Sequence, residues 1–245
     1  SQWAANSDNL IHPKSAQQCK YKVTFIGAAY GNRKKWIRQL NERGVKVDCF
    51  GYGWPNGVIK SEEIPVIVNQ SVISLNFGDS GIVFDDYILT RSRQIKARVF
   101  EVPGSGGFLI TETADQLNNY YNVGKEIIVY IDIGDLASKI QYYLNNMDKR
   151  DVIANASFEK TKNQHTYEIR FNEILKLAYD RKNRSKLQTC AIDINSFLKL
   201  KKQHNINIML ILLRSFIKLP CILLFGRRRG PRLARRLIYE ISWRF

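Results

Sequence analysis

YKVTFIGAAYGNRKKWIRQLNERGVKVDCF, residues 21–50, decides the fold class of this chain. Residues 21–27 are rich in β-branched and aromatic side chains and end at a glycine, and residues 45–50 form a second such run. Between them, residues 32–43 carry apolar side chains at helical spacing. A strand, a helix and a strand in so short a stretch predict a right-handed βαβ unit, and therefore a parallel sheet with helices packed on it.

The alternation of strand and helix patterns continues beyond this unit. Apolar runs suited to buried parallel strands lie at residues 72–77, 107–111 and 126–131. Helical patterns lie at residues 61–69, 97–102, 114–121, 135–145, 148–163 and 166–179. We therefore expect an α/β domain over residues 21–180, built on a Rossmann-like, doubly wound parallel sheet of about five strands. Residues 1–20 show no apolar period and are expected to form a flexible arm or the remnant of an upstream segment.

The net charge of +16 is concentrated at one end of the chain. Residues 181–245 contain 16 Lys and Arg against two acids, Asp193 and Glu240, whereas residues 1–180 are nearly neutral. With 44% hydrophobic residues overall, the chain has enough apolar material to bury a core. The sequence therefore predicts a basic amphipathic helical tail over residues 181–245, suited to attachment to an anionic surface.

Three interpretations of this tail remain open. Residues 206–225 are long enough to cross a bilayer, but Arg214 and Lys218 near the middle would each cost about 2.5–3.5 kcal/mol at its centre. An interfacial helix whose bases reach the headgroups costs less, which favours peripheral attachment to an anionic membrane through residues 206–245 and a cytoplasmic location at its inner face. A helical pair that binds a partner is the alternative. Nucleic-acid binding is disfavoured because aromatic residues are not interleaved with the bases.

Metal and disulfide chemistry find little support in the sequence. The four cysteines are far apart, form no CxxC pair and have no histidine at ligand spacing, so reduced thiols are expected. The paired acids Asp85 and Asp86 lie in a polar stretch and are interpreted as a surface loop. We predict no metal site and no bound cofactor.

The turn after the first strand, Gly27 to Lys35 (GAAYGNRKK), could bind phosphate. Backbone N–H groups at the start of a helix favour anions, and Arg33 could add a bidentate contact. The turn matches neither the GxGxxG fingerprint nor a P-loop, and a tight turn with solvated bases is the favoured interpretation of it.

A second motif runs from Lys96 to Glu112 (KARVFEVPGSGGFLITE). A short helix carries Arg98 and Glu101, and a glycine-rich turn then allows the backbone to approach a ligand before the next strand begins. A carboxylate suits a ribose diol and an arginine suits a diphosphate, but the two side chains could equally form a structural ion pair.

A histidine at the start of the last helical pattern is a weak catalytic candidate. His165 lies in HTYEIR, residues 165–170, and could act as a general base. A histidine at this place more often caps a helix or packs beneath a neighbour, and no other catalytic residue can be named.

Taken together, these segments resemble one family. The order is strand–YGNR–helix, SLNF, RVFEVPGSGGFLITE, EIIVYIDIGDLASKIQYYL and HTYEIRFNEIL. It is similar to the CgeB-like (spore-protein) glycosyltransferases, which are related to the group-1 transferases of the GT-B fold. The similarity covers roughly residues 23–177.

The resemblance implies that the domain is the C-terminal, donor-binding half of a GT-B enzyme that transfers a sugar without a metal. The donor would be a nucleotide-diphosphate sugar, and the acceptor a glycan, a lipid-linked glycan or a protein. The residues implied in donor binding are Arg33, Lys96, Arg98, Glu101, Gly104, Gly106 and Gly107. Glu101 corresponds to the acid that holds the ribose. Many retaining members have another Glu eight residues earlier, where this sequence has Arg93.

A GT-B enzyme needs two Rossmann-like halves, and only one is expected here. An acceptor-binding half would then lie upstream or on another chain, and the sequence given would be a fragment or module. A non-catalytic nucleotide-sugar-binding module and a basic membrane or nucleic-acid adaptor are the alternatives that the sequence leaves open.

Overall fold

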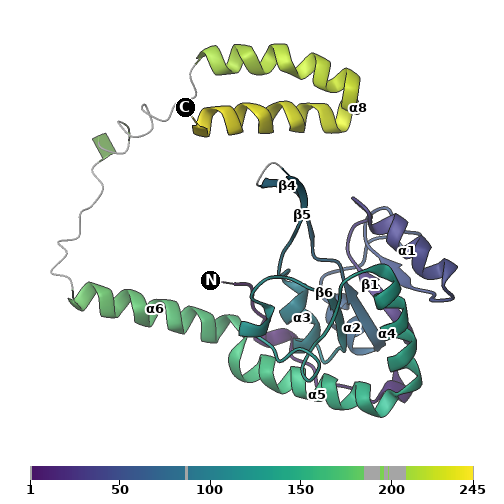
Figure 1. Cartoon of the computed structure of the whole chain (residues 1–245). Coiled ribbons are helices and arrows are strands. Elements are labelled where there is room, and N and C mark those ends of the chain that lie inside the picture. The colour runs from purple at the N-terminus through teal and green to yellow at the C-terminus, as the bar shows by residue number, and fades with distance from the viewer. Residues whose placement is uncertain (1, 86–87, 185–193, 196–197, 199–207, 245) are drawn as a thin grey trace. The chain divides into compact units, whose positions relative to one another are not determined.

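The structure is a computed structural model that describes residues 2–85, 88–184, 194–195, 198 and 208–244 (Figure 1). The chain divides into two compact units, Ser1–Arg181 and Lys182–Phe245.

The first unit is built on five parallel strands in the order β2-β1-β3-β6-β7. The strands are β1 (Tyr21–Ile26), β2 (Asp48–Phe50), β3 (Ser71–Asn76), β6 (Leu109–Glu112) and β7 (Ile128–Tyr130). Since the strand order reverses between β1 and β3, the carboxyl ends of these two strands flank the crevice where such sheets bind ligands. The predicted doubly wound α/β fold is confirmed.

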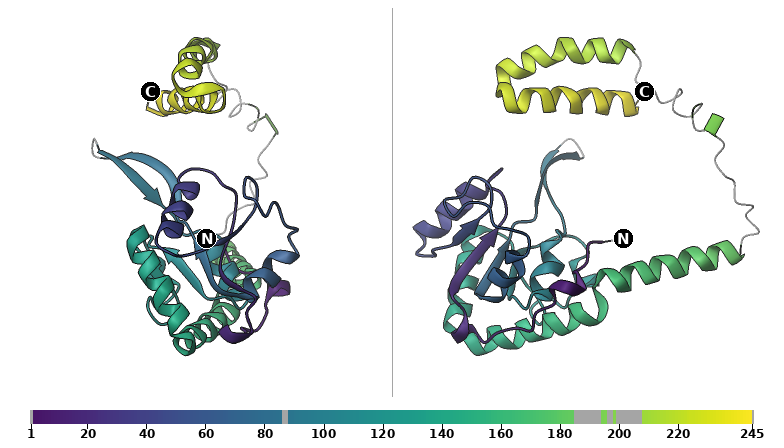
Figure 2. Two further views of the ribbon diagram at one scale, coloured as in Figure 1. Left: turned by 90° about the vertical axis from the view of Figure 1, so that its right-hand side faces the viewer. Right: turned by 180° about the vertical axis from the view of Figure 1, so that it is seen from behind.

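Helices cover both faces of the sheet (Figure 2). Apolar residues of α1 (Arg33–Glu42) and α4 (Ile133–Asn145) belong to one buried cluster. Those of α2 (Glu63–Asn69) and α3 (Arg98–Gly104) belong to the other. The long helix α5 (Met147–Gln164) packs against α3 and α4, and α6 (Tyr167–Arg184) follows it. The helix patterns at residues 32–43, 61–69, 97–102, 135–145, 148–163 and 166–179 therefore correspond to α1 through α6.

A β-hairpin that the sequence analysis missed rises from the carboxyl edge of the sheet (Figure 1). Strands β4 (Asp79–Asp85) and β5 (Ile88–Arg93) pair antiparallel between β3 and α3. Two β-rich runs separated by a pair of acids carried the signal for this hairpin. Asp85 ends β4 and Asp86 lies outside the described residues.

The helix expected over residues 114–121 is wrong. Only Leu117–Asn119 form a single 3₁₀ turn, η3. Gln116 adopts a positive φ of 63°, a left-handed conformation that no residue of an α-helix can take. The apolar spacing arises instead because Leu117 and Tyr121 are buried in the cluster beneath α3.

The segment before β1 lies against the domain, in contrast to the flexible arm expected from its composition. It contains the short turns η1 (Ser7–Asn9) and η2 (Ala16–Gln18). Ala5 N donates to His165 O at 2.8 Å, and Tyr167 N donates to Ala5 O at 3.0 Å. Further along, Ile11 N donates to Gly104 O at 3.0 Å. These are main-chain contacts, which leave no periodic signal in a sequence.

Arg150 of α5 ties the N-terminal segment and the sheet together. Its side chain is fully buried. Nε donates to Val72 O at 2.7 Å, Nη2 to Ser71 O at 2.9 Å, and Nη1 to Lys14 O at 2.9 Å and to the Asp151 carboxylate at 3.0 Å. Since every contact involves a buried or half-buried polar group, removing the guanidinium leaves several acceptors without a donor.

We expect Arg150→Met to lower the free energy of unfolding by about 3–5 kcal/mol, because the carbonyl groups and the Asp151 carboxylate lose their buried charged partner. Urea denaturation followed by circular dichroism measures this. Lys162→Met, on an exposed site of the same helix, is the matched control and should change stability by less than about 1 kcal/mol. Equal stability of the two variants would contradict the role given to Arg150.

The second unit contains α8 (Ile208–Arg244), which is two helices joined at Gly226. Gly226 has a φ of 77° and breaks the helical path. The two arms run back along each other as a helical hairpin (Figure 2). No helix among the described residues is both long enough and apolar enough to cross a membrane.

Candidate functional site

Part of the predicted motif lies beside a pocket of about 230 Å³. The pocket is enclosed by the start of α2, by α3 and by the N-terminal segment. Its lining residues are Ala4, Ala5, Asn6, Asn9, Ser61, Ile64, Pro65, Arg98, Glu101, Gly104, Ser105 and Tyr167. Three of the predicted site residues are therefore brought together, namely Arg98, Glu101 and Gly104.

Arg98 and Glu101 present opposite charges to this pocket. Both stand on α3, and Arg98 Nη1 lies 3.2 Å from Glu101 Oε2. The exposed fractions are 24% for the Arg98 side chain and 43% for the Glu101 side chain, so a ligand can reach both. Because α3 follows the hairpin that leaves the carboxyl end of β3, its first residues lie toward the ligand-binding edge of the sheet.

The glycine turn after α3 is in contact with protein atoms. An ideal Cβ on Gly106 would lie 2.4 Å from Ile11 O, and Gly106 has a positive φ of 70°. A Cβ on Gly104 would lie 2.8 Å from the Ala5 side chain. Gly104 and Gly106 therefore allow the N-terminal segment to pack closely against this turn. Gly107 allows the same for Val68 of α2. Gly106 and Gly107 do not line the pocket.

Arg33 stabilises the turn after β1 through contacts with residues of the turn itself. Its Nη1 donates to Ala28 O at 2.8 Å, and its guanidinium lies 3.9 Å from the centre of the Tyr30 ring and 5.3 Å from that of Phe25. The side chain is only 9% exposed. Arg33 therefore fixes the loop that precedes α1 and does not line the pocket.

Lys96 also lies outside the pocket lining. Its Nζ donates to Gln94 Oε1 at 2.9 Å, within the segment that joins β5 to α3. Its predicted role in donor binding, like that of Arg33, stays a prediction.

A comparison with protein families identifies the domain. Residues 33–176, more than half of the chain, match the family model described as Glycosyl transferase-like. The chain belongs to this family. No curated protein sequence matches the chain. The CgeB-like assignment is narrower than this family and stays a prediction.

Solved structures share the fold of this glycosyl transferase-like domain. Sucrose-phosphate synthase from Thermosynechococcus elongatus matches with a TM-score of 0.56 and 13% identity, covering 75% of this chain and 52% of that protein. TarM matches with a TM-score of 0.50 and 11% identity, covering 69% and 37%. The GtfA/B complex matches with a TM-score of 0.50 and 14% identity, covering 72% and 39%. The chain thus has a GT-B-type fold and spans about half, or less, of the length of these proteins.

His165 is buried in an aromatic cluster at the end of α5. Its Nε2 lies 2.8 Å from Tyr120 O and its Nδ1 lies 3.4 Å from Arg170 Nη2, so the neutral ring can donate to the first and accept from the second. Phe100 and Tyr121 pack on the ring. Burial lowers the pKa of His165, the Tyr120 carbonyl opposes this effect and Arg170 adds to it. These contacts favour a structural role for His165 in the glycosyl transferase-like domain.

Glu112, the last residue of β6, has no role predicted from the sequence. Its carboxylate is almost fully buried, lies 3.3 Å from Arg93 Nε and accepts from Gly78 N at 3.0 Å. Arg93 ends β5 and Gly78 precedes β4, so Glu112 fastens both ends of the hairpin to the sheet. A charged residue at the end of an apolar strand was the available signal. Glu112 also lines a second pocket of about 170 Å³ with Trp36 and Tyr130.

In residues 2–85, 88–184, 194–195, 198 and 208–244, no group of three His, Cys, Asp or Glu side chains is placed to hold a metal ion.

We expect acid to destabilise this domain partly through His165. Because its folded-state pKa is lowered, the unfolded chain binds a proton that the folded chain does not, so stability falls as the pH drops below the usual value of about 6.5. His165→Gln should reduce the loss of stability between about pH 7.5 and pH 5.5. Urea denaturation at both pH values measures it, and an unchanged loss in the variant would contradict a buried neutral ring.

Proposed function

We propose that this chain is the donor-binding half of a glycosyltransferase that uses a nucleotide-diphosphate sugar. The observation that carries the proposal is the pocket in which Arg98 and Glu101 stand together on α3 of a glycosyl transferase-like domain. The proposal gives less weight to four further residues, because they do not line this pocket. They are Arg33, Lys96, Gly106 and Gly107.

The charges of the pocket suit the two chemically distinct parts of such a donor. A guanidinium donates to phosphate oxygens in a planar, bidentate geometry. A carboxylate accepts hydrogen bonds from both hydroxyls of a ribose. With 3.2 Å between the two side chains, a nucleoside diphosphate can contact both at once after exchanging their mutual ion pair for its own contacts.

Neighbouring polar groups would complete the recognition. Asn6, Asn9, Ser61 and Ser105 add amide and hydroxyl groups to the wall, and they can donate to or accept from sugar hydroxyls. The pocket therefore combines one cation, one anion and several neutral polar groups, which is the mixture that a nucleotide sugar requires.

The pocket is smaller than the roughly 300–1,000 Å³ that encloses a drug-sized ligand. At about 230 Å³, it would hold the centre of a nucleotide sugar and leave the remainder outside. In a two-half enzyme the opposite half covers that remainder and brings the acceptor. We propose an acceptor-binding domain, on the same or another chain, for this role.

An exposed apolar surface on α6 supports the need for a further domain. Its side chains are 42–65% exposed. They are Phe171, Ile174, Leu175, Leu177 and Tyr179. Phe171, Ile174 and Leu175 share one side of the helix by its periodicity, and contiguous exposed apolar surface is typical of an interaction face. The acceptor would be a glycan, a lipid-linked glycan or a protein.

We expect Glu101→Ala to weaken nucleoside diphosphate binding about tenfold or more, because a hydrogen bond to a charged group contributes about 1.5–3 kcal/mol. Calorimetric titration of wild type and variant with UDP and with GDP measures the affinity and also identifies the base.

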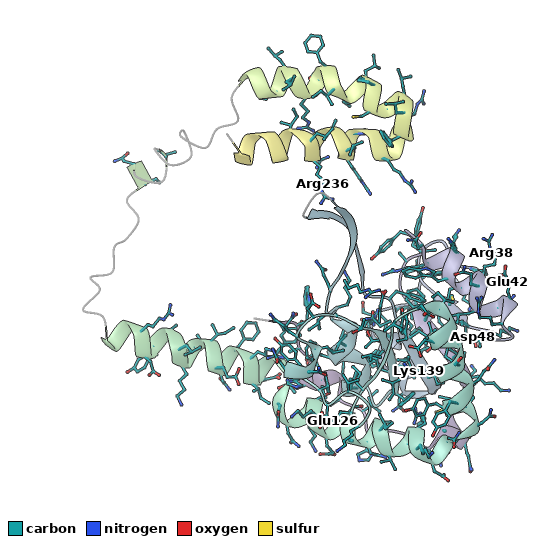
Figure 3. The ribbon with its side chains drawn as sticks, viewed as in Figure 1. Arg38, Glu42, Asp48, Glu126, Lys139 and Arg236 are labelled. Atoms are coloured by element: carbon teal, nitrogen blue, oxygen red, sulfur yellow. The ribbon has the colours of Figure 1, made fainter. Side chains whose placement is uncertain are left out.

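Glu42→Ala is the matched control, because Glu42 also pairs with an arginine of its own helix, Arg38, at 3.7 Å (Figure 3). Its affinity should equal that of wild type. If Glu101→Ala binds both nucleotides as tightly as Glu42→Ala, the proposed ribose contact is wrong.

Arg98→Met tests the phosphate contact separately. The variant should lose affinity for UDP or GDP about tenfold and keep its affinity for the corresponding nucleoside, because only the diphosphate contacts the guanidinium. Competition titrations with nucleoside and nucleoside diphosphate distinguish the two. A parallel loss for both ligands would place Arg98 elsewhere in the site.

A further inference from the structure

The helical hairpin of the second unit presents two chemically opposite faces. Its first arm, residues 208–225, is rich in exposed apolar side chains. Its second arm, residues 227–244, is rich in arginine. The pocket proposed for the donor is lined by residues of the first unit, so the surface of the hairpin is considered by itself.

The two arms of the hairpin pack closely against each other. Cys221, Ala234 and Ile238 are buried. An ideal Cβ on Gly230 would lie 2.5 Å from Ile222 Cα and 2.6 Å from Cys221 O, so only glycine allows this approach. This contact fixes which sides of the two arms face inward and which face outward.

An apolar ridge stands on the outer side of the first arm. Leu212, Phe216, Leu219 and Leu223 follow one another at intervals of four, three and four residues and therefore share one face. They are 56–78% exposed. Cys221, which is buried against the second arm, lies on the opposite side at the same periodicity. The ridge thus points away from the second arm.

The cations lie away from this ridge. By the same periodicity, Arg214 and Lys218 lie on the side of the first arm near Cys221. On the second arm, Arg229, Arg232 and Arg236 lie opposite the buried face formed by Gly230 and Ala234. Figure 3 shows Arg236 pointing away from the first arm. Residues 208–238 contain no Asp or Glu.

We propose that this hairpin is a two-layer anchor for an anionic bilayer, in which the ridge enters the boundary between headgroups and acyl chains and the arginines remain at the level of the phosphates. Burial of the ridge removes apolar surface from water. Packed arms lie about 8–10 Å apart, a spacing that puts the second arm in the headgroup layer when the first arm lies at its base. Arg214 and Lys218 then reach the same phosphates by extending along the helix.

An apolar face and a cationic face on the same hairpin together indicate which partner binds it. A second copy of the hairpin would cover the ridge but would place like charges close together. A nucleic acid would satisfy the arginines but leave the ridge in water. An anionic bilayer satisfies both faces at once.

Vesicle flotation of the full chain tests the proposal. Binding should be strong to vesicles that contain phosphatidylglycerol, weak to phosphatidylcholine alone, and weaker at high salt. Replacing Arg229, Arg232 and Arg236 by Gln should weaken binding roughly a hundredfold, since each cation near an anionic leaflet contributes roughly fivefold.

The matched charge control replaces Lys34, Arg38 and Lys46 by Gln. These exposed bases lie on α1 and before β2, so the net charge changes equally while the tail is intact. Its vesicle affinity should remain close to that of wild type. An equal loss in both triple variants would overturn the proposal in favour of a general effect of net charge.

The ridge has its own pair of variants. Phe216→Ser with Leu219→Ser should weaken binding about tenfold or more. Phe171→Ser with Leu175→Ser removes the same two side-chain types from exposed sites on α6 and should not weaken it. Since the ridge residues are outside the contact between the arms, helix content by circular dichroism should be unchanged.

Depth of insertion separates the bilayer from the other occupants. The chain has four tryptophans of its own, so each variant is compared with wild type. Leu223→Trp should add emission that lipids brominated in their acyl chains quench, and Arg236→Trp should add emission that they do not quench. Equal quenching at both sites would overturn the two-layer arrangement. Two other results would also overturn the proposal. One is self-association in sedimentation without vesicle binding, and the other is arginine-dependent binding of single-stranded RNA without vesicle binding. Vesicle binding and nucleotide titration report on different units, so either proposal can fail without the other.

Discussion

The pocket of this domain depends on one close approach, that of the N-terminal segment to the glycine turn after α3. A side chain at Gly104 or Gly106 would collide with Ala5 or with the Ile11 carbonyl. Because no side chain is present, residues 4–9 lie beside α3 and supply one wall of the pocket. The glycines therefore shape the pocket indirectly. Because they have no side chain, the N-terminal segment can pack against α3, and this segment forms one wall of the pocket.

The sheet and its helices could be predicted from sequence because their signals are local. Each buried strand is a short apolar run, and α1 and α4 show the spacing of one apolar face. The family motif added Glu101 and Arg98, and the structure brings these two residues into one pocket. The helical pattern at residues 97–102 placed both on one helix, whereas the contact of the motif's glycines with other parts of the protein was not visible in the sequence.

The features that sequence reasoning missed have physical causes in common. The N-terminal segment is held through main-chain hydrogen bonds, which any residue except proline can make. The fastening of the hairpin by Glu112 depends on Arg93, which is distant along the chain. His165 was a candidate because of its chemistry, whereas its surroundings were set by Phe100 and Tyr121. Each of these features depends on contacts between residues that are distant along the chain, and a single sequence does not reveal such contacts.

The pairing of Ala5 with Thr166 also bears on the order in which the domain folds. Next to it, the Ser7 hydroxyl donates to the Glu168 carboxylate across 161 residues of chain. Closing so long a loop is entropically costly before other contacts exist. The sheet can form earlier from neighbouring βα units. We therefore expect the N-terminal segment that forms one wall of the pocket to be among the last parts of the domain to fold. A chain that binds ligand in this pocket would then be one whose folding is complete.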